Sequence, residues 1–152
     1  MWSAATVLVC ALGMLGRSPN TLPPIVFVDT PPRGASPHVE AFVVRGANTI
    51  VLVASSAVFR AAQSAPVRCG NHDAVRKIAS IIVHEEWHVR HGPDERGAYQ
   101  AQLMALLRMG ATIETPAFRE VSRAFRFVTT VPPPVLATMP HASQPLPGGR
   151  RR

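Results

Sequence analysis

The chain has 152 residues, which is enough for one small domain with flanking segments and too few for two independent cores. Its formal charge of +7 comes almost entirely from arginine, since Lys77 is the only lysine, and the arginines are scattered rather than clustered. We therefore expect no nucleic-acid partner. The two cysteines, Cys10 and Cys69, are too few for a disulfide scaffold or a cysteine-based zinc site, and Cys69 is expected to be a buried or half-buried thiol.

Residues 1–20 form an apolar leader. Its run from Ala4 to Leu15 has about the length of a signal-peptide core and is short for a membrane span. No basic residue precedes the run and no clean A-x-A cleavage site follows it, so a helix packed on the domain is the alternative. We expect the protein to be exported or membrane-associated, in a bacterial periplasm or cell envelope, with this leader as a possible tether. A cytoplasmic location is the alternative.

Three apolar runs after the leader are typical of short strands: residues 25–29, 39–44 and 49–55. The last two are separated by a short polar segment with Ala47-Asn48 where a turn is needed, which predicts a hairpin. Residues 56–65 are expected to form a short helix.

Helices dominate the second half of the chain. Asn71 is a suitable N-cap for a long helix that must end at Gly92-Pro93, because proline cannot continue the hydrogen-bond ladder. A second helix is expected from there to about Gly110, and a third after Thr115, with Pro116 in its first position. We expect residues 21–130 to form the domain and the proline- and arginine-rich residues 131–152 to be a disordered tail.

The chemistry of the chain is concentrated in the segment HEEWHVRHGPDERGAY, residues 84–99, which holds three of the six histidines and three of the six glutamates. His84 and His88 are four residues apart, so on a helix their imidazoles project from one face and can reach one metal ion. Glu85 can lie beside the metal without binding it, where it can take a proton from a metal-activated water. The spacing is that of the H-E-x-x-H motif.

A catalytic zinc needs a third protein ligand, and three residues compete for that role. His91 continues the same helix but lies about 10 Å along its axis from His84. Asp94 has the position of the last ligand in H-E-x-x-H-x-x-G-x-x-H/D, but His91 stands where that pattern requires glycine. Glu95 follows the Gly92-Pro93 break, and a helix-turn-helix fold-back would bring it toward the two histidines.

The segment from His84 to Gln102 resembles the gluzincin-type zinc metalloproteases of the small bacterial kind. In that family a second helix carries a glutamate ligand in an E-x-x-A pattern, which Glu95-Arg96-Gly97-Ala98 matches. The resemblance implies zinc ligands at His84, His88 and Glu95, and a catalytic glutamate at Glu85. It also implies an α+β, zincin-like fold, in which a short β-sheet packs on an active-site helix followed by a second, ligand-bearing helix.

The function expected from these residues is zinc-dependent hydrolysis of peptide bonds in a peptide or protein substrate by a monomer. The alternative is a non-catalytic, degenerate domain that serves as a binding or regulatory module. His91, Asp94 and Tyr99 are the other candidate site residues. Asp94 can orient a ligand histidine, and Tyr99 either stabilises a developing oxyanion or packs against Leu103. Glu86 is expected to be solvated or paired with Arg90, and Trp87 to be a packing anchor.

Overall fold

The computed structural model describes residues 1–130, and in this range the chain forms five α-helices and a three-stranded sheet. The expected α+β class is therefore confirmed. The tail expected over residues 131–152 lies outside the described residues.

The sheet consists of β1 (Ile25–Val28), β2 (Ala41–Val44) and β3 (Thr49–Val53), in the order β1-β3-β2. β2 and β3 form the expected antiparallel hairpin, with Phe42 opposite Val51, and β1 runs parallel to β3. The hairpin turn uses left-handed backbone at Gly46 (φ 87°) and Asn48 (φ 48°). β3 is the central strand, so its apolar residues are the buried ones, and β2 is an edge.

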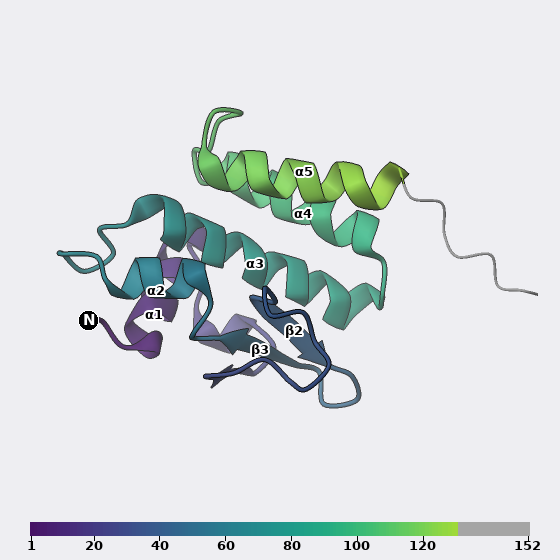
Figure 1. The fold of residues 1–152 in the computed structure, drawn as a ribbon, viewed down its shortest axis with the longest axis horizontal. Coiled ribbons are helices and arrows are strands. Elements are labelled where there is room, and N and C mark those ends of the chain that lie inside the picture. The colour runs from purple at the N-terminus through teal and green to yellow at the C-terminus, as the bar shows by residue number, and fades with distance from the viewer. Residues whose placement is uncertain (131–152) are drawn as a thin grey trace, which may run out of the picture.

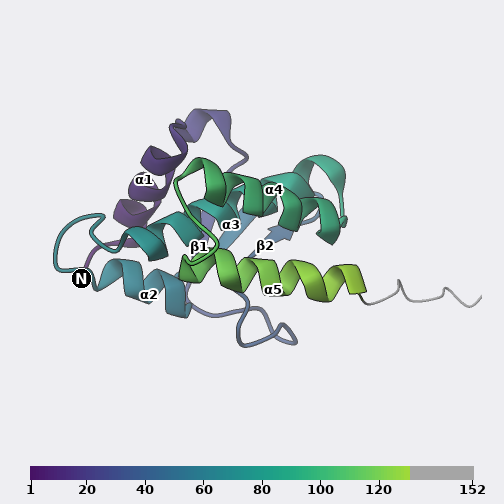
Figure 2. The same ribbon diagram turned by 90° about the horizontal axis from the view of Figure 1, so that it is seen from above.

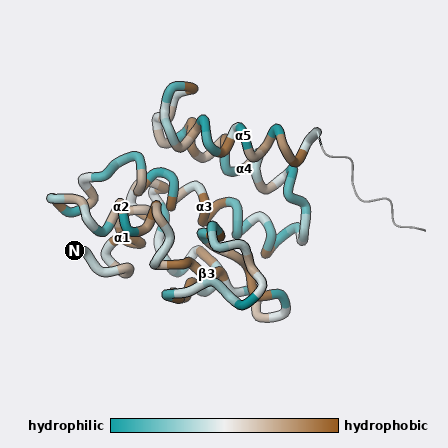
Figure 3. Tube along the Cα trace, viewed as in Figure 1, coloured by the Kyte–Doolittle hydropathy of each residue, from teal (hydrophilic) through white to brown (hydrophobic). Residues whose placement is uncertain are grey.

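The long helix α3 (His72–His91) runs across the middle of the molecule, between the sheet and the last two helices (Figure 1). It begins at the expected N-cap, where Asn71 Oδ1 accepts from the Ala74 amide at 3.1 Å. Its apolar face joins the core formed with β3, with α1 (Ala4–Leu15) and with the expected short helix α2 (Ala57–Gln63). Figure 3 shows hydrophobic residues concentrated in β3 and in the middle of α3.

The last two helices, α4 (Glu95–Arg108) and α5 (Pro116–Thr130), form an antiparallel pair on the other side of α3 (Figure 2). A small second core around Leu106, Ala117 and Val121 joins them. α5 buries only Ala117 and Val121, so it covers the domain with one face and leaves the rest in solvent.

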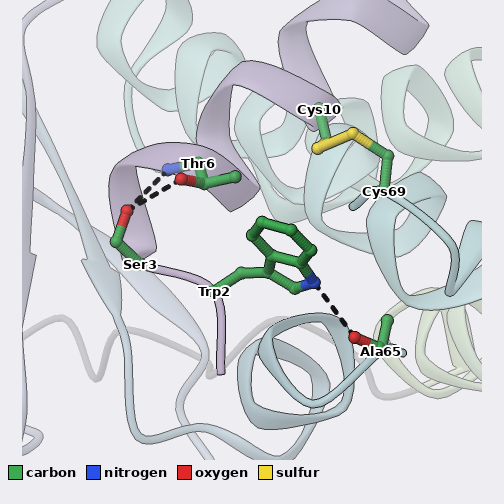
Figure 4. The surroundings of a disulfide bond; sticks show 6 residues. All are labelled: Trp2, Ser3, Thr6, Cys10, Ala65 and Cys69. Atoms are coloured by element: carbon green, nitrogen blue, oxygen red, sulfur yellow. Dashed lines mark hydrogen bonds between the residues drawn. A yellow bond between two sulfur atoms is a disulfide. The ribbon is translucent and has the colours of Figure 1, made fainter. Parts of the chain in front are cut away.

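The apolar leader is a helix of the folded domain. α1 (Ala4–Leu15) buries Val7, Cys10, Ala11 and Leu12 in the main core. The structure pairs Cys10 with Cys69 in a disulfide, so the expectation of a free thiol at Cys69 was wrong. Figure 4 shows this bond beside Trp2, whose indole Nε1 donates to the Ala65 carbonyl at 3.0 Å. Among residues 1–130, no helix combines the length and apolar character needed to cross a bilayer.

Candidate metal centre

Three side chains from two helices converge at the C-terminal end of α3. His84 and His88 have their Nε2 atoms 3.1 Å apart, and each faces a different oxygen of Glu95, His84 at 3.4 Å from Oε2 and His88 at 3.4 Å from Oε1. The ligand-type atoms of this triad all lie within 4.8 Å of one another. Of the three candidates for a third ligand, the structure thus brings Glu95 to the histidine pair.

Glu95 reaches the histidines because the chain reverses at Gly92. This residue has φ 77° and ψ −151°, a conformation that is open essentially only to glycine. Its amide donates to the His88 carbonyl at 3.0 Å and closes the last turn of α3. α4 then begins at once, with Asp94 as its N-cap and Glu95 in its first turn.

A second glycine allows α4 to approach α3 closely. A Cβ atom at Gly97 would lie 2.5 Å from Cζ2 of Trp87, which is too close for any residue with a side chain. Glycine in a helix costs about 1 kcal/mol relative to alanine, and here the close packing of the two helices depends on it. Sequence reasoning used Gly97 only as part of the E-x-x-A pattern and missed this role. A glycine in the first turn of a helix is nevertheless a sign that another part of the chain approaches closely there.

A hydrogen-bond chain fixes the protonation of His84. The Ser80 hydroxyl donates its single hydrogen to the Lys77 carbonyl at 2.7 Å, so it must accept from Gln102 Nε2 at 3.2 Å. The amide oxygen of Gln102 therefore faces His84 Nδ1, at 3.1 Å, and can only accept. It follows that His84 carries its proton on Nδ1.

His88 is held in the same tautomer by the backbone. Its Nδ1 atom lies 2.8 Å from the carbonyl oxygen of Gly92, which again can only accept. In neutral form, both imidazoles therefore present bare lone pairs at Nε2, toward each other and toward the Glu95 carboxylate. A metal cation shared by the three groups would satisfy both lone pairs and the carboxylate. Two imidazole nitrogens and a carboxylate oxygen are a donor set suited to zinc.

Glu85 lies beside this group and is almost completely buried, with 7% of its surface exposed. Burial raises the pKa of its carboxyl, while His84 and His88 oppose the rise. The pKa of Glu95 is lowered instead, chiefly by its hydrogen bond with His84. The centre thus holds two carboxylates that differ in basicity, one ionised against the histidines and one desolvated.

The group of His84, His88 and Glu95 opens into a cleft of about 580 Å³. α3 forms its floor, the segment from His38 through β2 forms one wall, and α5 forms the opposite wall. Tyr99 also lines the cleft and packs edge-on against His84, with ring centroids 4.6 Å apart. Burial raises the pKa of its phenol, so the hydroxyl keeps its proton.

The remaining residues singled out from the sequence lie outside the ligand group. His91 is exposed and stacks on Trp87, with ring centroids 4.0 Å apart. Asp94 caps α4 by accepting from the Gly97 amide at 3.1 Å, so its carboxylate orients a helix and no ligand histidine.

The expectation of a solvated Glu86 was wrong. Its side chain is buried, and the residue is 6% exposed. The carboxylate accepts a hydrogen bond from Arg90 Nη2 at 2.6 Å, which is the pairing expected as the alternative. It is also paired with both terminal nitrogens of Arg17, one of them at 2.8 Å. Sequence reasoning missed Arg17, which joins the segment after α1 to α3.

Comparison with known proteins found no family model, no curated protein and no solved structure that matches this chain. The fold and the site define an α+β domain with a group of two histidines and one glutamate that could hold a metal ion.

Proposed function

We propose that the protein is a zinc-dependent metallopeptidase. The observation that carries this proposal is the buried Glu85 carboxylate beside three converging ligand atoms at the floor of an open cleft. A site that served only to stabilise the fold would gain nothing from a desolvated carboxylate at this point, because burying one is costly. The resemblance of His84–Gln102 to gluzincin-type proteases supports the same function.

In this proposal His84, His88 and Glu95 hold the zinc ion. When bound, the ion would supply a Lewis acid that polarises a carbonyl and lowers the pKa of water toward about 7. Glu85 would accept a proton from the attacking water and deliver it to the leaving amine. Tyr99, with its proton retained, can donate a hydrogen bond to an oxygen on which negative charge develops.

We also propose that the protein works in an oxidising compartment, outside the cytoplasm. The Cys10–Cys69 disulfide supports this, because such bonds persist mainly in exported proteins. α1 would then be kept in the working protein, since removing it would remove Cys10 and part of the core. Titrating free thiols in protein isolated from its host tests this point: two free thiols per native chain would contradict it.

The test of the peptidase proposal is hydrolysis of a mixed peptide library by zinc-loaded protein, with the Glu85→Gln variant in parallel. We expect cleavage by the wild type and loss of about 10²- to 10⁴-fold in the variant. Cleavage at equal rates by both proteins would contradict the assigned role of Glu85, and cleavage by neither would contradict the peptidase proposal.

A further inference from the structure

The cleft contains a buried ammonium group that the proposed chemistry does not use. Lys77 is the only lysine of the chain and is 8% exposed. Its Nζ atom lies 2.7 Å from Glu40 Oε1 and 2.7 Å from Glu120 Oε1. Glu40 directly precedes β2 and Glu120 belongs to α5, so one lysine on the floor of the cleft connects its two walls. We call these three residues the ion-pair bar.

The ion-pair bar separates two hollows along α3. The metal cleft lies over the C-terminal half of this helix, and a second hollow of about 600 Å³ lies between α2, the N-terminal half of α3 and the start of α5. Only four residues line both hollows, namely the three of the bar and His38. The ion pairs of the bar therefore span the groove along α3 from wall to wall at the point where the two hollows meet.

The bar lies at a fixed distance from the metal ligands. Lys77 and His84 are seven residues apart, or two helical turns, so both side chains project from the same face of α3 about 10 Å apart along its axis. An extended peptide advances about 3.3 Å per residue. The space between the bar and the metal ligands accordingly accommodates about three residues of an extended substrate.

The charge of the bar selects the group that meets it. Two carboxylates and one ammonium leave a net charge of −1, and Lys77 engages only Oε1 of each glutamate. Within residues 1–130, neither Oε2 atom makes a hydrogen bond to the protein. A cation with hydrogen-bond donors satisfies both the charge and the oxygens, whereas a carboxylate would be repelled.

We propose that the ion-pair bar recognises an ammonium group of the substrate about three residues before the bond that is cleaved. Because the bar spans the groove, it favours the amino terminus of a peptide as the source, and a lysine side chain is the other source with the same chemistry. The inference rests on the proposed peptidase function, and it makes the protein an enzyme that releases short fragments from amino termini.

The experiment measures peptide binding without cleavage, using full-length, zinc-loaded Glu85→Gln protein and calorimetry. One series of peptides shares a sequence and carries a free or an acetylated amino terminus. A second series is acetylated throughout and carries lysine or norleucine at the third position. We expect acetylation to weaken binding about tenfold, the effect of removing one charged hydrogen-bonded group. Tight binding of the acetylated lysine peptide would identify the side chain as the source of the ammonium group.

Adding Glu120→Gln to the Glu85→Gln protein makes the ion-pair bar neutral. It should abolish the difference in affinity between peptides with free and acetylated amino termini. Glu120 is exposed, and Glu40 still pairs with Lys77 in this variant, so the fold should persist. Glu114→Gln is the matched control, because it makes the same chemical change at an exposed site outside both hollows. Equal binding of all peptides would overturn this inference and leave the peptidase proposal intact. Binding of none, together with no hydrolysis by the wild type, would overturn both.

Discussion

Nδ1 of His84 lies 3.1 Å from the amide oxygen of Gln102, and the orientation of that amide is set by Ser80. Gln102 and Ser80 are both buried, and neither is among the ligands themselves. Their hydrogen-bond chain keeps the proton of His84 away from Nε2, which is the atom that faces His88 and Glu95. Replacing residues that hydrogen-bond to the other ring nitrogen of a metal-binding histidine commonly lowers the metal affinity strongly.

Replacing Gln102 by leucine should therefore weaken zinc binding about 10- to 100-fold, because His84 then loses the acceptor that fixes its tautomer. A chelator competition assay gives the affinity, and long-range nitrogen NMR of the imidazole reports the tautomer directly. Gln100→Leu is the matched control, since Gln100 lies on the same helix and is exposed. Unchanged affinity and an unchanged tautomer in Gln102→Leu would contradict the proposed role.

The same site shows which features the sequence reveals and which it does not. The histidine pair was predictable because residues four apart share a helical face, and Gly92-Pro93 marks the end of that helix. The sequence left three candidates for a third ligand, because His91, Asp94 and Glu95 all follow within seven residues of His88, and the turn at Gly92 decides which of them meets the histidines. Gln102 acquires its role only when α4 packs on α3, which depends on the missing side chain of Gly97.

Long-range pairings were the least predictable features. Cys10 and Cys69 are 59 residues apart, and Arg17 and Glu86 are 69 apart, so no local pattern connects them. Both pairs link the N-terminal segment, whose apolar sequence resembles a leader, to later parts of the domain. Its burial follows from packing against α3 and α2. The strands and helices, by contrast, follow from local signals and were expected within a few residues of where they lie.

The Arg17–Glu86 pair predicts a pH-dependent stability. The hydrogen bond and the charge of Arg17 hold the pKa of Glu86 below its ordinary value of 4.5, so the pair stabilises the fold above that pH. This contribution is lost as the pH falls through the lower pKa of the folded state. Glu86→Gln should therefore lower the free energy of unfolding by about 2 kcal/mol at pH 7, and by progressively less below about pH 4.

Urea unfolding of the wild type and Glu86→Gln at several pH values measures this difference. Glu114→Gln, at an exposed carboxyl, should change stability little at any pH. A difference that stayed constant from pH 7 to pH 3 would show that the charge of Glu86 is not what stabilises the fold.

Breaking the disulfide should lower stability without removing the metal ligands. A disulfide that closes a loop of this length stabilises the folded state by about 4 kcal/mol, because it lowers the conformational entropy of the unfolded chain. We expect Cys10→Ser/Cys69→Ser to melt well below the wild type, and reductant to lower the melting temperature of the wild type alone. Zinc affinity at low temperature should be unchanged, because neither cysteine is part of the ligand group. A variant that melts with the wild type would contradict the stabilising role.

The most direct measurement is the zinc content and zinc affinity of purified protein, for the wild type and for single alanine variants. We predict about one tightly bound zinc ion per chain in the wild type and in Glu85→Gln, and little in His88→Ala. Glu95→Ala should weaken binding more than Asp94→Ala or His91→Ala, since only Glu95 faces both Nε2 atoms. A wild-type protein that binds no stoichiometric zinc would contradict the metal centre, and with it the proposed function.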